Sequence, residues 1–90
     1  MTVRRTVEII NERGLHARAS AKFVKLASDF DAEVRVSRDG STVDARSIMG
    51  LMMLAAGVGS TIDISAEGPQ AQEALDALEA LVANRFDEDR

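Results

Sequence analysis

The spacing of the apolar residues along this chain changes several times, from every second residue to every third or fourth and back. The two-residue period is typical of strands with one buried face, and the longer period is typical of amphipathic helices. Strands are predicted over 3–9, 33–37, 42–44 and 61–66, and helices from 17 to about 29, 47–55 and 69–82. In a single domain of 90 residues, this order predicts an α+β open-faced sandwich, a four-stranded antiparallel sheet with three helices on one face.

Short polar and glycine-containing segments separate the predicted elements. Asp39-Gly40 predicts a tight hairpin turn between the second and third strands. Gly68-Pro69 precedes the last helix, and proline is well suited to a first helical position. Residues 85–90 are mostly charged, so we expect them to form a frayed tail after the last helix.

The composition excludes several kinds of site. The chain has no cysteine and one histidine, which excludes a disulfide framework, a thiolate metal site and a histidine-rich zinc site. No apolar run approaches the ~20 residues that a membrane span needs, and no apolar segment follows Arg4-Arg5 as it would in a signal peptide. We therefore expect a cytoplasmic protein with no metal, no cofactor and no membrane partner.

The formal net charge is −4, and it is unevenly distributed. Residues 1–50 carry nine Lys and Arg against seven Asp and Glu, whereas residues 51–90 carry two against eight. Three phenylalanines are the only aromatic residues, so a base-stacking surface is not expected. Nucleic acid is thus a disfavoured partner, and a structural or RNA-binding module remains the weakest of the alternatives.

The only histidine lies in Gly14-Leu15-His16-Ala17-Arg18, where the strand pattern gives way to the helical one. The unpaired N–H groups of Ala17 and Arg18 at such a helix start favour an anion. Unprotonated imidazole is a nucleophile at neutral pH, and the Arg18 guanidinium can add charge-assisted hydrogen bonds to an oxyanion. The segment predicts a phosphoryl group carried on His16. The alternatives are a histidine that caps the helix or lies in a loop, and a solvated arginine.

The middle helix is predicted to begin at Ser47, a residue type that commonly caps helix N-termini. This helix is apolar almost all round, and we assign Leu51 and Leu54 to the core. Methionine adapts well to varied partners, so an exposed apolar surface here would suit partner binding. The alternatives are complete burial or a dimer contact. The residues expected to be at least partly exposed are Ile48, Met49 and Met52.

Two separated segments resemble those of the HPr family, the histidine-containing phosphocarrier proteins of the bacterial phosphotransferase system. The segment from Gly14 to Arg18 resembles the active-site motif, the segment from Ser47 to Met52 resembles the motif around a regulatory serine, and the resemblance covers nearly the whole chain. It implies that His16 accepts phosphate on Nδ1 from phosphorylated enzyme I, assisted by Arg18, and passes it to a histidine of an enzyme IIA domain. Such a protein is a carrier with a covalent phosphohistidine rather than an autonomous enzyme.

The same resemblance implies regulation and a docking surface. An HPr kinase/phosphorylase would phosphorylate Ser47, and the middle helix would lie beside His16 and form part of the docking face. We expect Arg18, Lys22 and Arg46 to form a basic rim that attracts acidic partners. A regulatory protein of a nitrogen-related branch, acting by phosphorylation-dependent binding, is the alternative to a role in sugar transport.

One residue departs from the family pattern. Ala19 occupies the position after the active-site arginine, where the family usually has proline. Alanine favours helix and restores an N–H group, so we expect the helix start to persist. We also expect a monomer, with weak self-association through exposed methionines as the alternative.

Overall fold

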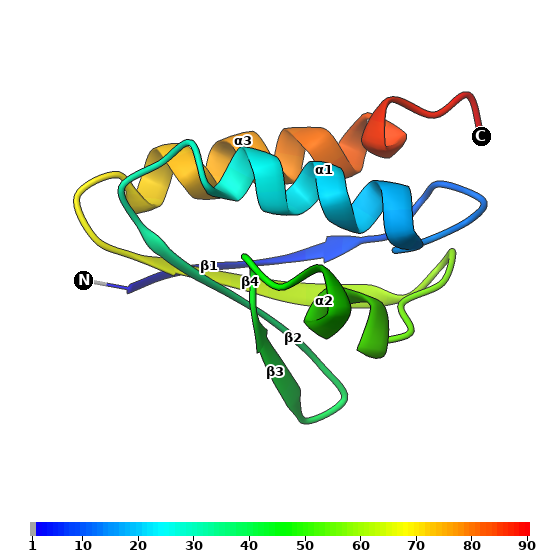
Figure 1. Cartoon of the computed structure of the whole chain (residues 1–90), viewed down its shortest axis with the longest axis horizontal. Coiled ribbons are helices and arrows are strands. Elements are labelled where there is room, and N and C mark those ends of the chain that lie inside the picture. Colours follow the sequence, from blue (N-terminus) through cyan, green and yellow to red (C-terminus); the bar gives the residue numbers. More distant parts are fainter. Residues whose placement is uncertain (1) are drawn as a thin grey trace.

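The structure is a computed structural model that describes residues 2–90, and its elements follow the predicted order. They are β1 (Thr2–Glu8), α1 (Ala17–Ala27), β2 (Glu33–Arg38), β3 (Ser41–Asp44), α2 (Ile48–Met53), β4 (Thr61–Glu67), α3 (Ala71–Ala83) and a short turn, η1 (Arg85–Asp87). The helices lie on one face of the sheet, where α1 contacts both α2 and α3. The other face of the sheet is open (Figure 1). The predicted fold class is confirmed. None of the described helices is long and apolar enough to cross a membrane.

The sheet has the strand order β1-β4-β2-β3, and every neighbouring pair is antiparallel. β4 lies between β1 and β2, with Thr2 opposite Glu67 at one end of its pairing with β1. The β2–β3 hairpin turns at Asp39 and Gly40, whose φ angles of 51° and 84° suit a tight two-residue turn. The predicted hairpin is thus present.

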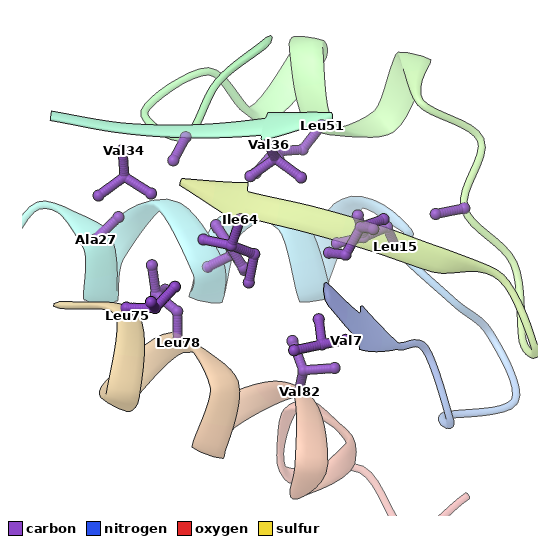
Figure 2. Packing of buried hydrophobic residues seen from close by; sticks show 14 of the residues in the cluster. Val7, Leu15, Ala27, Val34, Val36, Leu51, Ile64, Leu75, Leu78 and Val82 are labelled. Carbon is purple, nitrogen blue, oxygen red and sulfur yellow. The ribbon is translucent and has the colours of Figure 1, made fainter. Parts of the chain in front are cut away.

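The core lies between the sheet and the helices (Figure 2). Val36 of β2 and Ile64 of β4 point toward the helices and are fully buried, as period-two alternation requires. Leu51 of α2 is also fully buried and Leu54 nearly so, which confirms the prediction for both. Burial of each such side chain stabilises the fold by about 1.5–3 kcal/mol.

A close backbone approach joins the loop before α1 to the segment after α2. Gly14 has a φ of 66°, and a Cβ atom there would lie 2.5 Å from the carbonyl oxygen of Ala56. The next residue, Leu15, donates its backbone N–H to the same oxygen at 2.9 Å. Only glycine fits this position, and the contact holds the end of α2 beside the start of α1.

Two helices differ in length from the prediction. α2 ends at Met53 rather than residue 55, because Ala55 has a φ of 53° and cannot continue a right-handed helix. α3 begins at Ala71 rather than residue 69, because Gly68 has a φ of 124° and Gln70 is held in a turn. Gln70 donates its backbone N–H to the Asp31 carbonyl at 3.0 Å and accepts the Asp31 N–H at 2.7 Å.

The prediction of a frayed C-terminal tail is wrong for residues 85–88. Phe86 is fully buried in the core, and its φ is positive, as are those of Arg85 and Asp87. Left-handed backbone is unfavourable for residues with side chains, so tertiary contacts must hold this turn. Lys22 donates from Nζ to the Phe86 carbonyl at 2.8 Å, and the tail lies at the same end of the molecule as the loop before α1 (Figure 1).

Candidate active site

His16 is the N-cap of α1, with extended backbone angles of −75° and −178°. Its side chain makes no hydrogen bond to the helix that it begins. The first intrahelical bond runs from the Ser20 N–H to the His16 carbonyl at 2.8 Å, so the N–H groups of Ala17, Arg18 and Ala19 have no carbonyl acceptor within the helix. This open helix end can bind an anion beside the imidazole.

The imidazole is held on one side by the C-terminal tail. His16 Nε2 is hydrogen-bonded to Oε2 of Glu88, and each of the two side chains is 17% exposed. Asn11 Nδ2 donates to the other Glu88 carboxylate oxygen at 3.0 Å and to the Gly14 carbonyl at 2.9 Å. These contacts engage Nε2, and Nδ1 has no hydrogen-bond partner within residues 2–90.

The environment of Glu88 keeps its carboxyl group charged. Burial raises the pKa of Glu88. Hydrogen bonds from Asn11 and His16, together with the charges of protonated His16 and of Arg13, lower it by more than burial raises it. The pKa of Glu88 therefore lies below its ordinary value. At neutral pH the side chain is a carboxylate, which accepts hydrogen bonds and donates none.

Two of the three predicted rim residues lie together. Arg18 and Lys22 line one shallow pocket, in which Arg13 and Glu88 also take part. Arg18 is exposed, whereas Lys22 bonds the tail and has its Nζ 3.8 Å from the Asp87 carboxylate. The charge of Lys22 is thus partly neutralised, and Arg18 is the more accessible cation.

Arg46, the third residue of the predicted rim, does not line this pocket. Its guanidinium bonds the Asp44 carboxylate at 3.3 Å and lowers the pKa of Asp44. It lines a pocket with Phe30 and Gly68, next to the C-terminal end of α1. Because α1 has 11 residues and rises ~1.5 Å per residue, roughly 16 Å separates this end from His16.

The start of α2 matches the prediction of a capping serine. Ser47 Oγ accepts the Gly50 N–H at 2.9 Å. The apolar residues predicted to be exposed are exposed, and they form what we call the α2 surface together with Met53, which the prediction omitted. The exposed fractions are 40% for Ile48, 69% for Met49, 40% for Met52 and 79% for Met53.

Comparison with known proteins places the chain in a family. The family model described as "PTS HPr component phosphorylation site" matches residues 3–84. The phosphocarrier protein HPr of Cupriavidus necator is 59% identical over 86 residues, which cover 96% of this chain and 97% of that protein. This chain belongs to the HPr family.

Two further comparisons extend the match. The phosphocarrier protein NPr of Escherichia coli is 47% identical over 90 residues, covering 99% of this chain and all of that protein. The crystal structure of HPr-C-His from Thermoanaerobacter tengcongensis matches with a TM-score of 0.93 at 42% identity, covering 98% of this chain and 99% of that one. The predicted family is therefore confirmed, and the chain has the fold and phosphocarrier character of HPr proteins.

The residue that departs from the HPr pattern leaves the helix start intact. α1 begins at Ala17, and Ala19 is fully buried in its first turn. The expectation that the helix would start normally without proline is confirmed. Ala19 adds a third N–H group without an acceptor in the helix to those of Ala17 and Arg18.

Sequence reasoning missed Asn11 and Glu88. Asn11 lies between the first predicted strand and the first predicted helix, yet it is fully buried, and its Oδ1 atom has no hydrogen-bond partner within residues 2–90. Glu88 was placed in the frayed tail. One signal was present in the sequence, because the apolar Phe86 stands alone among charged residues and could have suggested an anchored tail.

Proposed function

We propose that His16 accepts a phosphoryl group on Nδ1 from phosphorylated enzyme I and passes it to a histidine of an enzyme IIA domain. The observation that carries this proposal is the N-cap histidine whose imidazole leaves the helix end open. The Nδ1 lone pair forms the bond to phosphorus while the bond from phosphorus to the donor breaks, and that electron pair leaves with the donor. The protein is then a covalent carrier rather than an autonomous enzyme.

The groups around Nδ1 suit a phosphoryl group that must also be released. The N–H groups of Ala17 and Arg18, with that of Ala19, would bind the phosphoryl oxygens, and the Arg18 guanidinium would add a charge-assisted hydrogen bond. Lys22 is engaged by the tail. Arg18 and a few amides would stabilise the phosphoryl group without enclosing it.

The α2 surface supports docking of the donor and the acceptor. Its methionines can adapt to more than one partner, and the Gly14–Ala56 contact holds the end of this helix beside the active-site loop. Arg18 and Lys22 would attract acidic partner surfaces. Arg46, two residues before Ile48 and bonded to Asp44, would lie at the other edge of the α2 surface.

Ser47 is a candidate for regulatory phosphorylation by an HPr kinase/phosphorylase. A phosphate there would add about −1.5 to −2 charge at the start of α2, next to Ile48 and Met49 of the docking surface. Binding to partners with acidic surfaces would weaken. The oxygen that would be modified also accepts the Gly50 N–H, so modification would rearrange this cap.

A nitrogen-related regulatory role is the second candidate, because a protein named NPr matches this chain along its full length. In that role, phosphorylation of His16 would control binding to target proteins. Two observations would distinguish these candidates. One is which enzyme IIA domain accepts the phosphoryl group, and the other is whether a sugar is phosphorylated in turn. In either case we propose a monomeric, cytoplasmic protein.

Intact-mass measurement tests the carrier function. The protein is incubated with enzyme I from the same organism and phosphoenolpyruvate, in parallel with His16→Ala. We expect one acid-labile phosphoryl increment on the wild type and none on the variant. No increment on the wild type, with an enzyme I shown to phosphorylate itself, would contradict the proposal.

A further inference from the structure

The contact between His16 and the C-terminal tail raises the question of what Glu88 does in the reaction. We propose that Glu88 is a positioning residue, which holds the His16 imidazole with its hydrogen on Nε2 so that Nδ1 presents a lone pair to phosphorus. This inference rests on the proposed function. It adds a residue outside the two segments that carry the resemblance to HPr proteins, and outside residues 3–84 that the family model matches.

The tautomer follows from the chemistry of the pair. A carboxylate only accepts hydrogen bonds, so the ring nitrogen that contacts Glu88 must be the one that carries hydrogen. That nitrogen is Nε2. In the neutral imidazole the other nitrogen, Nδ1, then has the free lone pair, which is the form that a nucleophile at Nδ1 requires.

The carboxylate is itself held in place. Asn11 Nδ2 donates to Glu88 Oε1 at 3.0 Å, so one carboxylate oxygen faces Asn11 and the other faces His16. The Glu88 backbone N–H donates to the Arg85 carbonyl at 2.9 Å, and the buried Phe86 anchors the turn between them. The anchored turn therefore positions Glu88, and Glu88 in turn fixes the orientation of the His16 ring.

The charge that develops during transfer also favours this arrangement. When Nδ1 forms its bond to phosphorus, the hydrogen stays on Nε2 and the ring gains positive charge, which Glu88 faces directly. When the group leaves for the acceptor, the same hydrogen remains on Nε2 and the neutral tautomer is restored. The carboxylate contacts the ring on the Nε2 side, while Arg18 and the helix amides are available for the phosphoryl group.

The test compares Glu88→Gln with Asp89→Asn, which removes the same charge from the neighbouring residue. Glutamine can either accept from or donate to Nε2, so it no longer selects one tautomer. The ring ¹⁵N shifts of His16 in the unphosphorylated protein at pH 8.5 report the tautomer, and stopped-flow or quench assays with phosphorylated enzyme I report the initial rate. The spectra of the other residues show whether each variant is folded.

We expect distinct ¹⁵N shifts for a hydrogen-bearing Nε2 and a bare Nδ1 in the wild type and in Asp89→Asn. In Glu88→Gln the two shifts should move toward each other, and the initial rate should fall roughly tenfold, as is typical when the partner that orients a functional histidine is removed. Unchanged ring shifts in Glu88→Gln, or a wild-type rate despite changed shifts, would overturn the inference and leave the proposed function standing. A wild-type protein that enzyme I does not phosphorylate would overturn both.

Discussion

The starts of α1 and α2 are two helix N-termini that use their N-cap residues in opposite ways. Both N-caps have extended backbone, with ψ near 180° at His16 and at 107° at Ser47. Ser47 turns its side chain back to its own helix and accepts the Gly50 N–H, whereas His16 turns toward Glu88 and caps nothing. The capped end stabilises the fold, and the open end leaves N–H groups without an acceptor in the helix, where we propose that the phosphoryl group binds.

The largest expected effect comes from removing the anchor of the tail that holds His16. Phe86→Ala should lower the free energy of unfolding by about 3 kcal/mol, at the lower end of the range for buried phenylalanine because the strained turn can relax. The Ser47 cap should not change. Urea denaturation measures the stability, and hydrogen exchange of the Gly50 N–H tests the cap.

A Phe86→Ala variant as stable as the wild type would show that the tail is not anchored by this side chain. Loss of protection at Gly50 beyond the fall in global stability would mean that the two helix ends are not independent, and would break the comparison.

The next effect concerns the cation at the open helix end. Arg18→Ala should lower the rate of phosphorylation by enzyme I roughly tenfold or more, because a charge-assisted hydrogen bond to the phosphoryl oxygens is lost. Lys25→Ala, which removes an exposed charge from the last turn of the same helix, is the matched control. Equal rates for the two variants would show that Arg18 contributes only general electrostatic attraction and makes no specific bond to the phosphoryl group.

The caps themselves can be compared directly by stability. Ser47→Ala should lower the free energy of unfolding by about 1 kcal/mol, the usual value for a lost serine cap. In a Glu88→Ala background, which has already lost the contact between the tail and the ring, His16→Ala should cost less, since the His16 side chain makes no bond to α1. Thermal and urea unfolding give the two values, and a larger loss on removing His16 in that background would reverse our assignment of the capped and open ends.

The smallest expected effect is on the pH dependence of stability. Since folding lowers the pKa of Glu88 from the ordinary 4.5, its contribution to stability is present above that value and is lost as pH falls through the lower folded value. Between pH 5 and 3, the wild type should therefore lose more stability than Glu88→Gln. Asp44 titrates in the same direction beside Arg46, but it does so in both proteins and its effect cancels in the comparison.

Urea midpoints at the two pH values provide the measurement for this prediction. The charges that face Glu88 are those of His16 and Arg13, with Arg18 and Lys22 in the same pocket. Equal losses in the two proteins would show that the Glu88 carboxylate contributes nothing to folding.

The sequence predicted what depends on local pattern. Alternation at Val34 and Val36 predicted a half-buried strand, and Asp39-Gly40 predicted its turn. Ser47 predicted a cap, because capping depends on a residue type at a helix start. The position of His16 at the start of α1 followed from the change of period at the same place.

What the sequence did not predict depends on tertiary contacts. Phe86 becomes a core residue only because the surface formed by other elements accepts it, and Glu88 reaches His16 across 72 residues of chain. Arg46 lines a pocket with Phe30 and Gly68 rather than with Arg18, and its ion pair is with Asp44. Such placements require the strand order, which local periodicity does not contain.

The central claim is that His16 receives phosphorus on Nδ1 at an open helix end. The direct measurement is a ³¹P–¹⁵N correlation spectrum of the uniformly ¹⁵N-labelled protein after reaction with enzyme I and phosphoenolpyruvate. We predict a single phosphorus signal coupled to His16 Nδ1, with the hydrogen on Nε2. Phosphorus coupled to Nε2, or bound to an oxygen such as that of Ser47, would contradict the account.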